Sequence, residues 1–126
     1  MKPAVALRTV RRIALAQLEV EERLSHGSPA WFVRKKQFLH YWNNHHDDGW
    51  HAVWAAAPDG AQDMLVAAEP GLFFVPPYVG HRGWIGLNLD RASEDEITDV
   101  VANAWRTVAP TRLVAQVPAT RVTRAR

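Results

Sequence analysis

The 126-residue chain has no cysteine, which excludes disulfides, thiolate metal sites and cysteine nucleophiles. It also has no apolar run of the roughly 18–20 residues that a membrane-spanning helix needs. The segment Met1–Val10 has neither a long apolar core nor a small-residue cleavage site, so a secretory signal is not expected. These absences predict a cytoplasmic protein without a membrane partner.

Several catalytic patterns are missing as well. The chain has no glycine-rich phosphate loop, no His-Glu-x-x-His zinc motif and no serine nucleophile with a recognisable partner. It also lacks a close pair of carboxylates in a pocket-like context. We therefore predict no catalytic residue, no metal and no cofactor, and the pattern favours a non-enzymatic protein.

Tryptophan, in contrast, is abundant, with six residues in a chain whose length fits one domain. Each buried aromatic side chain removes about 150–250 Å² from water, so a compact core is feasible without disulfides. Five tryptophans lie in predicted strands or in the last predicted helix and are expected in the core: Trp31, Trp42, Trp54, Trp84 and Trp105. Trp50, beside Gly49 at a loop edge, is the best candidate for an exposed ring.

Charge is segregated along the chain although the net charge is only +2. Residues 1–36 hold eight Lys and Arg against three Glu, and residues 37–104 hold two Arg against ten Asp and Glu. Residues 105–126 hold five Arg and no acid. The two basic segments would form the patch typical of a nucleic-acid binder only where they meet in space.

Apolar periodicity predicts a first helix over residues 4–18, and residues 19–24 either extend it or form a separate turn. Aromatic and β-branched residues predict five strands, at 30–34, 37–42, 50–56, 72–75 and 84–89. The first three are joined by short polar links and so are expected to form an antiparallel meander. Asp59 and Gln62, as a capping pair, indicate a second helix that ends at Pro70-Gly71.

The last predicted helix has the clearest pattern. Ser93 and Glu96 form a capping box, apolar residues follow at helical spacing, and Pro110 marks the end. Helices that alternate with groups of antiparallel strands predict an α+β fold. We expect an antiparallel sheet of about five strands with helices packed on one face.

Two stretches of the chain resemble the MmcQ/YjbR family of small bacterial proteins. The matching residues are Ser25-His26-Gly27, Pro29, Trp31-Phe32, Lys36, Phe38, Pro77-Tyr78-Val79-Gly80, Gly83-Trp84 and Leu89. The resemblance implies one MmcQ/YjbR-like domain over residues 1–113 with a CyaY-like, frataxin-like fold. Residues 114–126 lie outside the resemblance, and their arginine-rich end predicts a basic, flexible tail.

The resemblance also implies DNA as a partner, because two β-hairpin "wings" of this fold have been proposed to bind it. The wing loops of this chain carry Arg34, Lys35, Lys36 and Arg82. Lysine and arginine neutralise phosphates without reading sequence, so weak, non-specific DNA binding is expected. Two departures from the family stand out. Leu18 replaces a frequent proline, and Lys35 replaces a turn glycine and adds positive charge.

An alternative hypothesis is a non-enzymatic module that binds a small molecule or a protein. His26 and His81 come from separate glycine-containing loops, and with Tyr78 and Trp84 they would line a polar groove. Histidine titrates near neutral pH and serves as a general acid or base, although His26 is equally suited to bracing a turn. The ligand and the choice between monomer and dimer stay open.

A cluster of histidines and aspartates lies in the middle of the chain, at His40, His45, His46, Asp47, Asp48 and His51. Imidazole and carboxylate ligate zinc, nickel or iron. A metal site needs three or four converging ligands, however, and the adjacent histidines would point apart in a strand. We interpret residues 43–49 as a polar turn.

Overall fold

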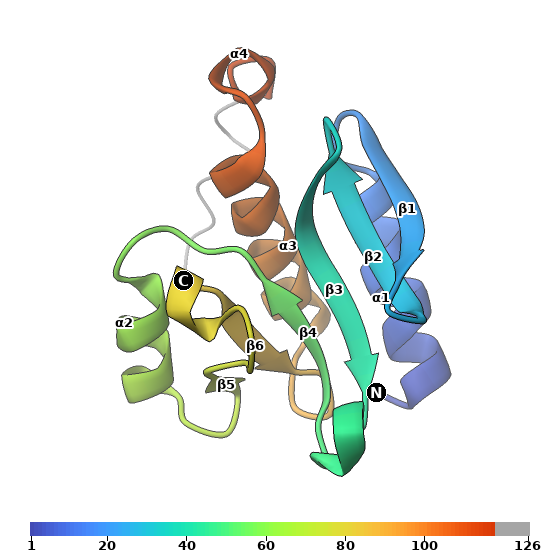
Figure 1. Ribbon diagram of the computed structural model, residues 1–126, viewed down its shortest axis with the longest axis vertical. Helices are drawn as coiled ribbons and strands as arrows, with labels where there is room; N and C mark the ends of the chain where they lie inside the picture. The colour runs from blue at the N-terminus through green and yellow to red at the C-terminus, as the bar shows by residue number, and fades with distance from the viewer. Residues whose placement is uncertain (118–126) are drawn as a thin grey trace.

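A six-stranded antiparallel sheet forms the centre of the computed structural model, which describes residues 1–117 (Figure 1). The strands are β1 (Val20–Ser25), β2 (Ser28–Val33), β3 (Lys36–Asn43), β4 (His51–Ala55), β5 (Phe73–Phe74) and β6 (Ile85–Asn88). Their order is β1-β2-β3-β4-β6-β5, so β2, β3 and β4 form the predicted meander. The α+β class is confirmed, with one strand more than predicted.

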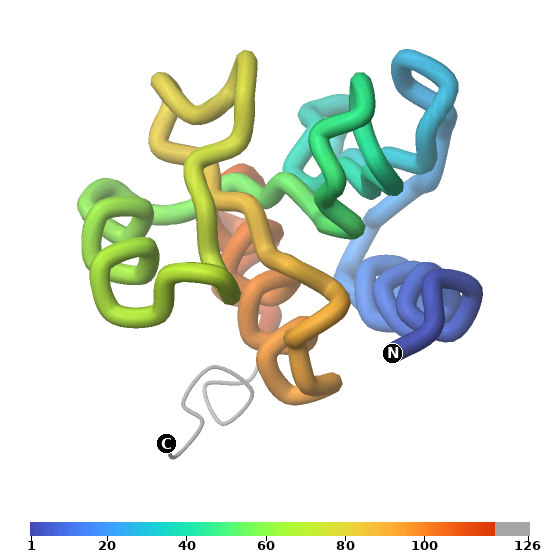
Figure 2. Tube along the Cα trace, turned by 90° about the horizontal axis from the view of Figure 1, so that it is seen from below, coloured from blue at the N-terminus to red at the C-terminus, as the bar shows by residue number. Residues whose placement is uncertain are grey.

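Two helices cover one face of the sheet, and the other face has no long helix within residues 1–117. The covering helices are α1 (Pro3–Leu15) and α3 (Glu94–Val108), while α2 (Ala61–Ala68) lies beside β5 (Figures 1 and 2). The shorter helices are α4 (Thr111–Val114) and the 3₁₀ turns η1 (His45–Asp47) and η2 (Gly80–Arg82). The loop of residues 75–83 and the turn after β1 lie on the uncovered side (Figure 2).

The first helix is shorter than predicted, and a short turn follows it before the chain enters the strand β1. The helix ends at Leu15, and Glu19 adopts a left-handed backbone that no regular helix accommodates. Residues 20–25 then pair along their whole length with β2. Glu19 therefore lies in a turn, as one of the two alternatives expected, whereas residues 20–24 are neither helix nor turn but strand. Val20 and Glu22, on one side of this edge strand, are half-buried, as is Ser25 at its end.

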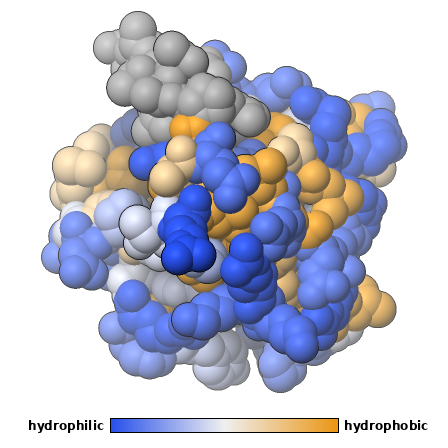
Figure 3. Space-filling model, turned by 90° about the horizontal axis from the view of Figure 1, so that it is seen from above, coloured by the Kyte–Doolittle hydropathy of each residue, from blue (hydrophilic) through white to orange (hydrophobic). Residues whose placement is uncertain are grey.

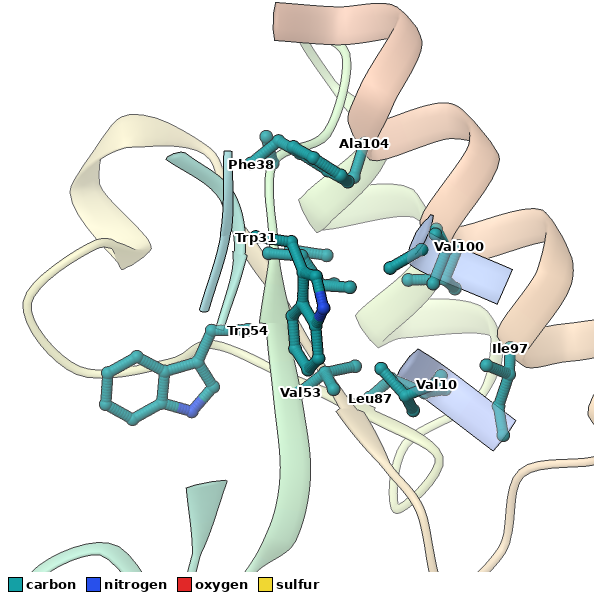
Figure 4. Close-up of a cluster of buried hydrophobic side chains, with 14 of the residues drawn as sticks. Val10, Trp31, Phe38, Val53, Trp54, Leu87, Ile97, Val100 and Ala104 are labelled. Carbon is teal, nitrogen blue, oxygen red and sulfur yellow. The ribbon is translucent and has the colours of Figure 1, made fainter. Parts of the chain in front are cut away.

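The main core lies between the sheet and the helices α1 and α3. Val10 of α1, Ile97 of α3 and Val53 of β4 are buried there, and Trp31 lies among them (Figure 4). The predicted capping box of α3 is present, since Ser93 accepts from the Glu96 amide and the Glu96 carboxylate accepts from the Ser93 amide. Local sequence therefore sets the start of the helix that closes the core.

The predicted capping pair of α2 does not form. The N-cap of α2 is Gly60, without a side-chain cap. Gln62 instead donates from its amide nitrogen to the carbonyls of Gly80 at 2.7 Å and Trp84 at 2.6 Å. This long-range contact takes the side chain away from the helix terminus, so Gln62 connects α2 to the 80–84 segment.

The C-terminal part of the described chain packs on the core. Leu113 of α4 is buried, and Val114 and Val117 contact the core cluster. The remaining residues of the predicted tail, 118–126, lie outside the described residues, and the predicted domain limits stay a prediction. Within residues 1–117, no helix combines the length and the apolar character that a membrane crossing requires.

Candidate functional site

The uncovered face of the sheet carries an unusual set of side chains because of a β-bulge at Phe38. Successive residues of β2 pair with Gln37 and Leu39, which leaves Phe38 as the extra residue of β3. Phe38 and Leu39 are therefore both in the core, whereas Gln37 and His40 both line the opposite face. From His40 onward the alternation of the strand places Trp42 on that uncovered face too.

A hollow of about 660 Å³ lies on this face, and we call it the aromatic groove. Figure 4 shows Trp54 on the opposite side of the sheet from Val53 and Leu87, although it is only 4% exposed. The groove is lined by Ser25, His26, Gln37, His40, Trp42, Asn43, Asn44, His45, His46, Trp54, Tyr78, Val79 and Trp84. No Asp or Glu of residues 1–117 lines it, so the aromatic and imidazole rings dominate its chemistry.

Left-handed backbone places several of these side chains. His26 and Gly27 form a two-residue turn between β1 and β2, and both have positive φ. His46, with φ of 48°, lies in the η1 turn, and Tyr78, with φ of 65°, lies in the loop before η2. Non-glycine residues adopt this conformation at a cost that the surrounding structure must offset, and such positions cluster at functional sites. Among residues 1–117, eight non-glycine residues have positive φ, and four of these line the groove.

Two indole N–H groups in the groove wall have no hydrogen-bond partner. They belong to Trp42 and Trp54, whose rings lie 5.2 Å apart between centroids. His45 packs edge-on against both, with centroid distances of 4.3 Å to Trp42 and 5.0 Å to Trp54. Tyr78 lies farther out, 6.5 Å from Trp54, and is 70% exposed. The two indole N–H groups are thus buried within a cluster of rings, and neither has an acceptor.

His40 forms the inner wall of the groove. Its Nε2 lies 3.0 Å from the Ser25 carbonyl oxygen, which can only accept, so Nε2–H is the donor. Burial lowers the pKa of His40, although the bond to Ser25 acts in the opposite direction. Burial also lowers the pKa of His45, and the nearby His46 adds to this effect. Both rings are therefore neutral at neutral pH, and they leave the groove without a buried positive charge.

A second hollow, of about 680 Å³, adjoins the groove, and we call it the basic depression. It is lined by Phe32, Lys35, Lys36, Gln37, Val79, Arg82, Trp84, Thr107 and Val108. Arg82 lies over the Trp84 ring, with 5.2 Å between its guanidinium carbon and the ring centroid. Seen from the end of the molecule that carries α4, hydrophilic side chains surround a band of apolar ones (Figure 3). Three of the four predicted wing residues thus share one hollow.

The fourth predicted wing residue, Arg34, does not join them. Its guanidinium forms a bidentate ion pair with the Glu19 carboxylate, which lowers the pKa of Glu19. Three further arginines of the N-terminal part also pair with glutamates, as Arg11–Glu22, Arg12–Glu94 and Arg23–Glu21. Across the part of the chain that the structure describes, Lys35, Lys36 and Arg82 form no salt bridge.

The predicted ligand groove is present with a different membership. His26, Tyr78 and Trp84 line it, but His81 is exposed in η2 and lies outside the lining. Sequence reasoning missed His40, Trp42 and Trp54 as lining residues, since their apolar strand pattern indicates core. The sequence did hold a signal, since His40 and Trp42 are two residues apart and so lie on one face of the strand. A buried imidazole needs a polar contact, which indicates that this face is not a purely apolar core. Trp50 is half-buried and stacks on Phe74 at 4.1 Å, unlike the exposed ring predicted.

Glycine permits that stack. Phe74 lies directly over Gly86 of β6, where an added Cβ would approach the ring to 2.4 Å. Covering of a strand glycine by an aromatic ring is a known way to stabilise a sheet edge. Trp50 and Phe74 therefore form a second aromatic pair on the uncovered face.

The histidine and aspartate cluster of the middle segment separates into different environments. His40 and His45 lie in the groove, while His51 is on β4. Within residues 1–117 no three His, Asp or Glu side chains converge as metal ligands. His51 instead links Tyr41 and Asp90: its Nδ1–H donates to the Asp90 carboxylate at 3.2 Å, and the Tyr41 hydroxyl lies 2.8 Å from Nε2. Burial, with the Asp90 charge, raises the pKa of Tyr41.

Comparison with known protein families places the groove within a recognised family. The profile of the family described as YjbR matches residues 15–107, a range that includes every residue lining the groove. No curated protein and no solved structure matches this chain. The family expected from the residue pattern is confirmed, while the CyaY-like fold and DNA binding stay predictions.

Proposed function

This chain belongs to the YjbR family, and we propose that it binds a small planar ligand in the aromatic groove. The observation that carries the proposal is the pair of buried indole N–H groups, of Trp42 and Trp54, that lack an acceptor. A buried donor without a partner costs about 1–3 kcal/mol. A ligand that carries a carbonyl or ring-nitrogen acceptor would remove this cost by accepting from the Trp42 and Trp54 N–H groups.

The size and composition of the groove support the same function. A volume of about 660 Å³ falls within the range of roughly 300–1,000 Å³ found for small-molecule sites. Such sites are mostly apolar and aromatic with a few polar groups that orient the ligand. Here the rings of Trp42, Trp54 and Trp84 supply the apolar walls, and His26 with Gln37 supplies polar contacts at the rim.

The indole N–H signals in an NMR titration test the proposal. With caffeine and 4-quinazolinone as uncharged planar probes, we expect the Trp42 and Trp54 signals to move, because a carbonyl of the probe accepts from them. The Trp31 and Trp105 N–H groups are internal controls, since they already donate to Glu22 and to the Leu18 carbonyl. Trp54→Phe, which keeps a ring but removes one donor, should weaken binding of both probes about five- to tenfold.

An unchanged spectrum at the solubility limit of both probes would contradict the proposal. Equal movement of all four indole signals would contradict it as well, because that pattern indicates a global change rather than binding in the groove.

Duplex DNA is a second candidate ligand, supported by the gathering of Lys35, Lys36 and Arg82 around one depression without a carboxylate partner among residues 1–117. Cations in this arrangement contact phosphates and release counterions. Acidic side chains of the η1 turn, Asp47 and Asp48, lie near the other end of β3 and do not line the depression.

Anisotropy with labelled duplex DNA tests this candidate. We expect a Kd of about 10⁻⁴–10⁻⁶ M that weakens steeply between about 50 and 200 mM salt. The double variant Lys35→Ala/Lys36→Ala should lower the affinity uniformly across DNA sequences. It should also reduce the slope of log affinity against log salt concentration by about two, one for each lost phosphate contact. Arg34→Ala is the matched control, because Glu19 already neutralises that guanidinium. An equal loss of affinity in Arg34→Ala and in the double variant would reject the assignment of the contacts.

A further inference from the structure

The aromatic groove and the basic depression are two parts of one surface. The two hollows share three lining residues, Gln37, Val79 and Trp84, and are therefore directly adjacent. Arg82 lies against Trp84 and therefore holds its guanidinium at the junction of the two. A ligand of moderate length can contact the rings of one hollow and the cations of the other at the same time.

The two parts require different chemistry from such a ligand. The groove offers ring faces and two indole donors, which suit a planar heterocycle with acceptor atoms. The depression offers Lys35, Lys36 and Arg82, which suit an anion of high charge density. Among the residues that the structure describes, neither hollow has an Asp or Glu in its lining to repel that anion.

Tyr78 supplies the third element. It is 70% exposed and is held by a left-handed backbone above the groove, 5.9 Å from His45 and 6.5 Å from Trp54 between ring centroids. Tyr78 lines the groove and not the depression, but the two hollows adjoin, and proteins combine exposed rings with a positively charged groove to bind unpaired bases.

We propose that the groove and the depression together bind one nucleotide unit, with its base against Tyr78 and Trp54 and its phosphate between Lys35, Lys36 and Arg82. This inference rests on the proposed ligand function and specifies the class of ligand. The unit comes either from a free nucleotide or from an unpaired position of a single strand. A paired base in a duplex keeps its faces stacked and does not reach the groove.

Calorimetry with the full-length protein tests the inference. The probes are AMP, GMP, CMP and UMP, each compared with its nucleoside, and a single-stranded oligothymidylate. At least one monophosphate is expected to bind about tenfold more tightly than its nucleoside, because charge-assisted contacts to the phosphate add to those of the base. The variant Lys35→Ala/Lys36→Ala/Arg82→Ala should lose this difference and retain nucleoside binding.

A second triple variant serves as the matched control. Lys2→Ala/Arg8→Ala/Arg112→Ala removes the same charge from exposed positions outside both hollows and should leave monophosphate affinity within about twofold. Tyr78→Ala should weaken the monophosphate and its nucleoside to the same extent.

The outcomes distinguish the sources and the failures. Tight binding of a monophosphate would identify a free nucleotide as the ligand. Binding of the oligothymidylate alone would identify a single strand as the ligand, and either result supports the inference. Equal affinity for monophosphate and nucleoside, or an unaffected lysine and arginine variant, overturns it. Absence of binding by all five nucleotide probes overturns it too, while movement of the Trp42 and Trp54 signals with caffeine would leave the ligand function itself intact.

Discussion

Replacing Trp31 by alanine is expected to lower the free energy of unfolding by about 3–5 kcal/mol. The side chain is fully buried between the sheet and the helices α1 and α3. Its Nε1–H donates to Glu22 at 3.0 Å, which connects β2 to the edge strand β1. Truncation would leave a closed cavity and remove this bond, and both effects lower stability in the same direction. Denaturant unfolding followed by circular dichroism measures the loss.

Trp54→Ala is the matched control for that experiment. Trp54 is also buried, but it lies on the uncovered face and its Nε1–H has no partner. Truncation there enlarges a hollow that already opens to water, so we expect a loss at least about 1 kcal/mol smaller than for Trp31→Ala. If Trp54→Ala lowered the free energy of unfolding as much as Trp31→Ala or more, Trp54 would stabilise the fold like a core residue. That result would argue against the groove as a ligand site.

The replacement His51→Phe is expected to lower the free energy of unfolding by about 2–3 kcal/mol. Phenylalanine fills a similar volume but cannot accept or donate a hydrogen bond, so the hydroxyl of the buried Tyr41 would lose His51 as its partner. A buried hydroxyl without a partner costs about 1–3 kcal/mol, and the bond from His51 to the Asp90 carboxylate is lost in addition. Thermal and denaturant unfolding of the variant give the value.

A double-mutant cycle isolates the contact. Tyr41→Phe removes the hydroxyl, so the combined variant has no unpaired donor and should be more stable than the sum of the single losses predicts. A coupling of about 0.5–3 kcal/mol is typical of groups in one hydrogen-bond network. Strict additivity of the two changes would show that the Tyr41 hydroxyl and His51 do not depend on each other.

The predictions that succeeded depend on residues close together in the chain. The α3 helix starts where Ser93 and Glu96 form their box, because both partners lie within one turn. The α2 cap failed for the complementary reason, since Gln62 donates to carbonyls 18 and 22 residues away. A local pattern predicts a contact well only when no distant group competes for the same donor.

The first edge of the sheet was missed because its signal is not local. Residues 20–25 are polar and strongly charged, and they form a strand only because β2 offers a partner along its whole length. The sequence did offer the step His26-Gly27 as an indication of a turn. In the structure both residues have positive φ, which suits a tight hairpin. That hairpin is what carries His26 to the groove.

The family, the α+β class and the two helices of the core follow from the sequence, because periodicity and capping act within a few residues. The composition of the candidate site, in contrast, depends on contacts between distant segments. The bulge at Phe38 selects which β3 side chains face the helices, and the absence of a long helix over the other face of the described sheet exposes the groove. Tertiary contact also neutralised Arg34 and left Lys35 and Lys36 beside Arg82. Faces, ion pairs and hollows arise from pairings between distant segments, which no local pattern contains.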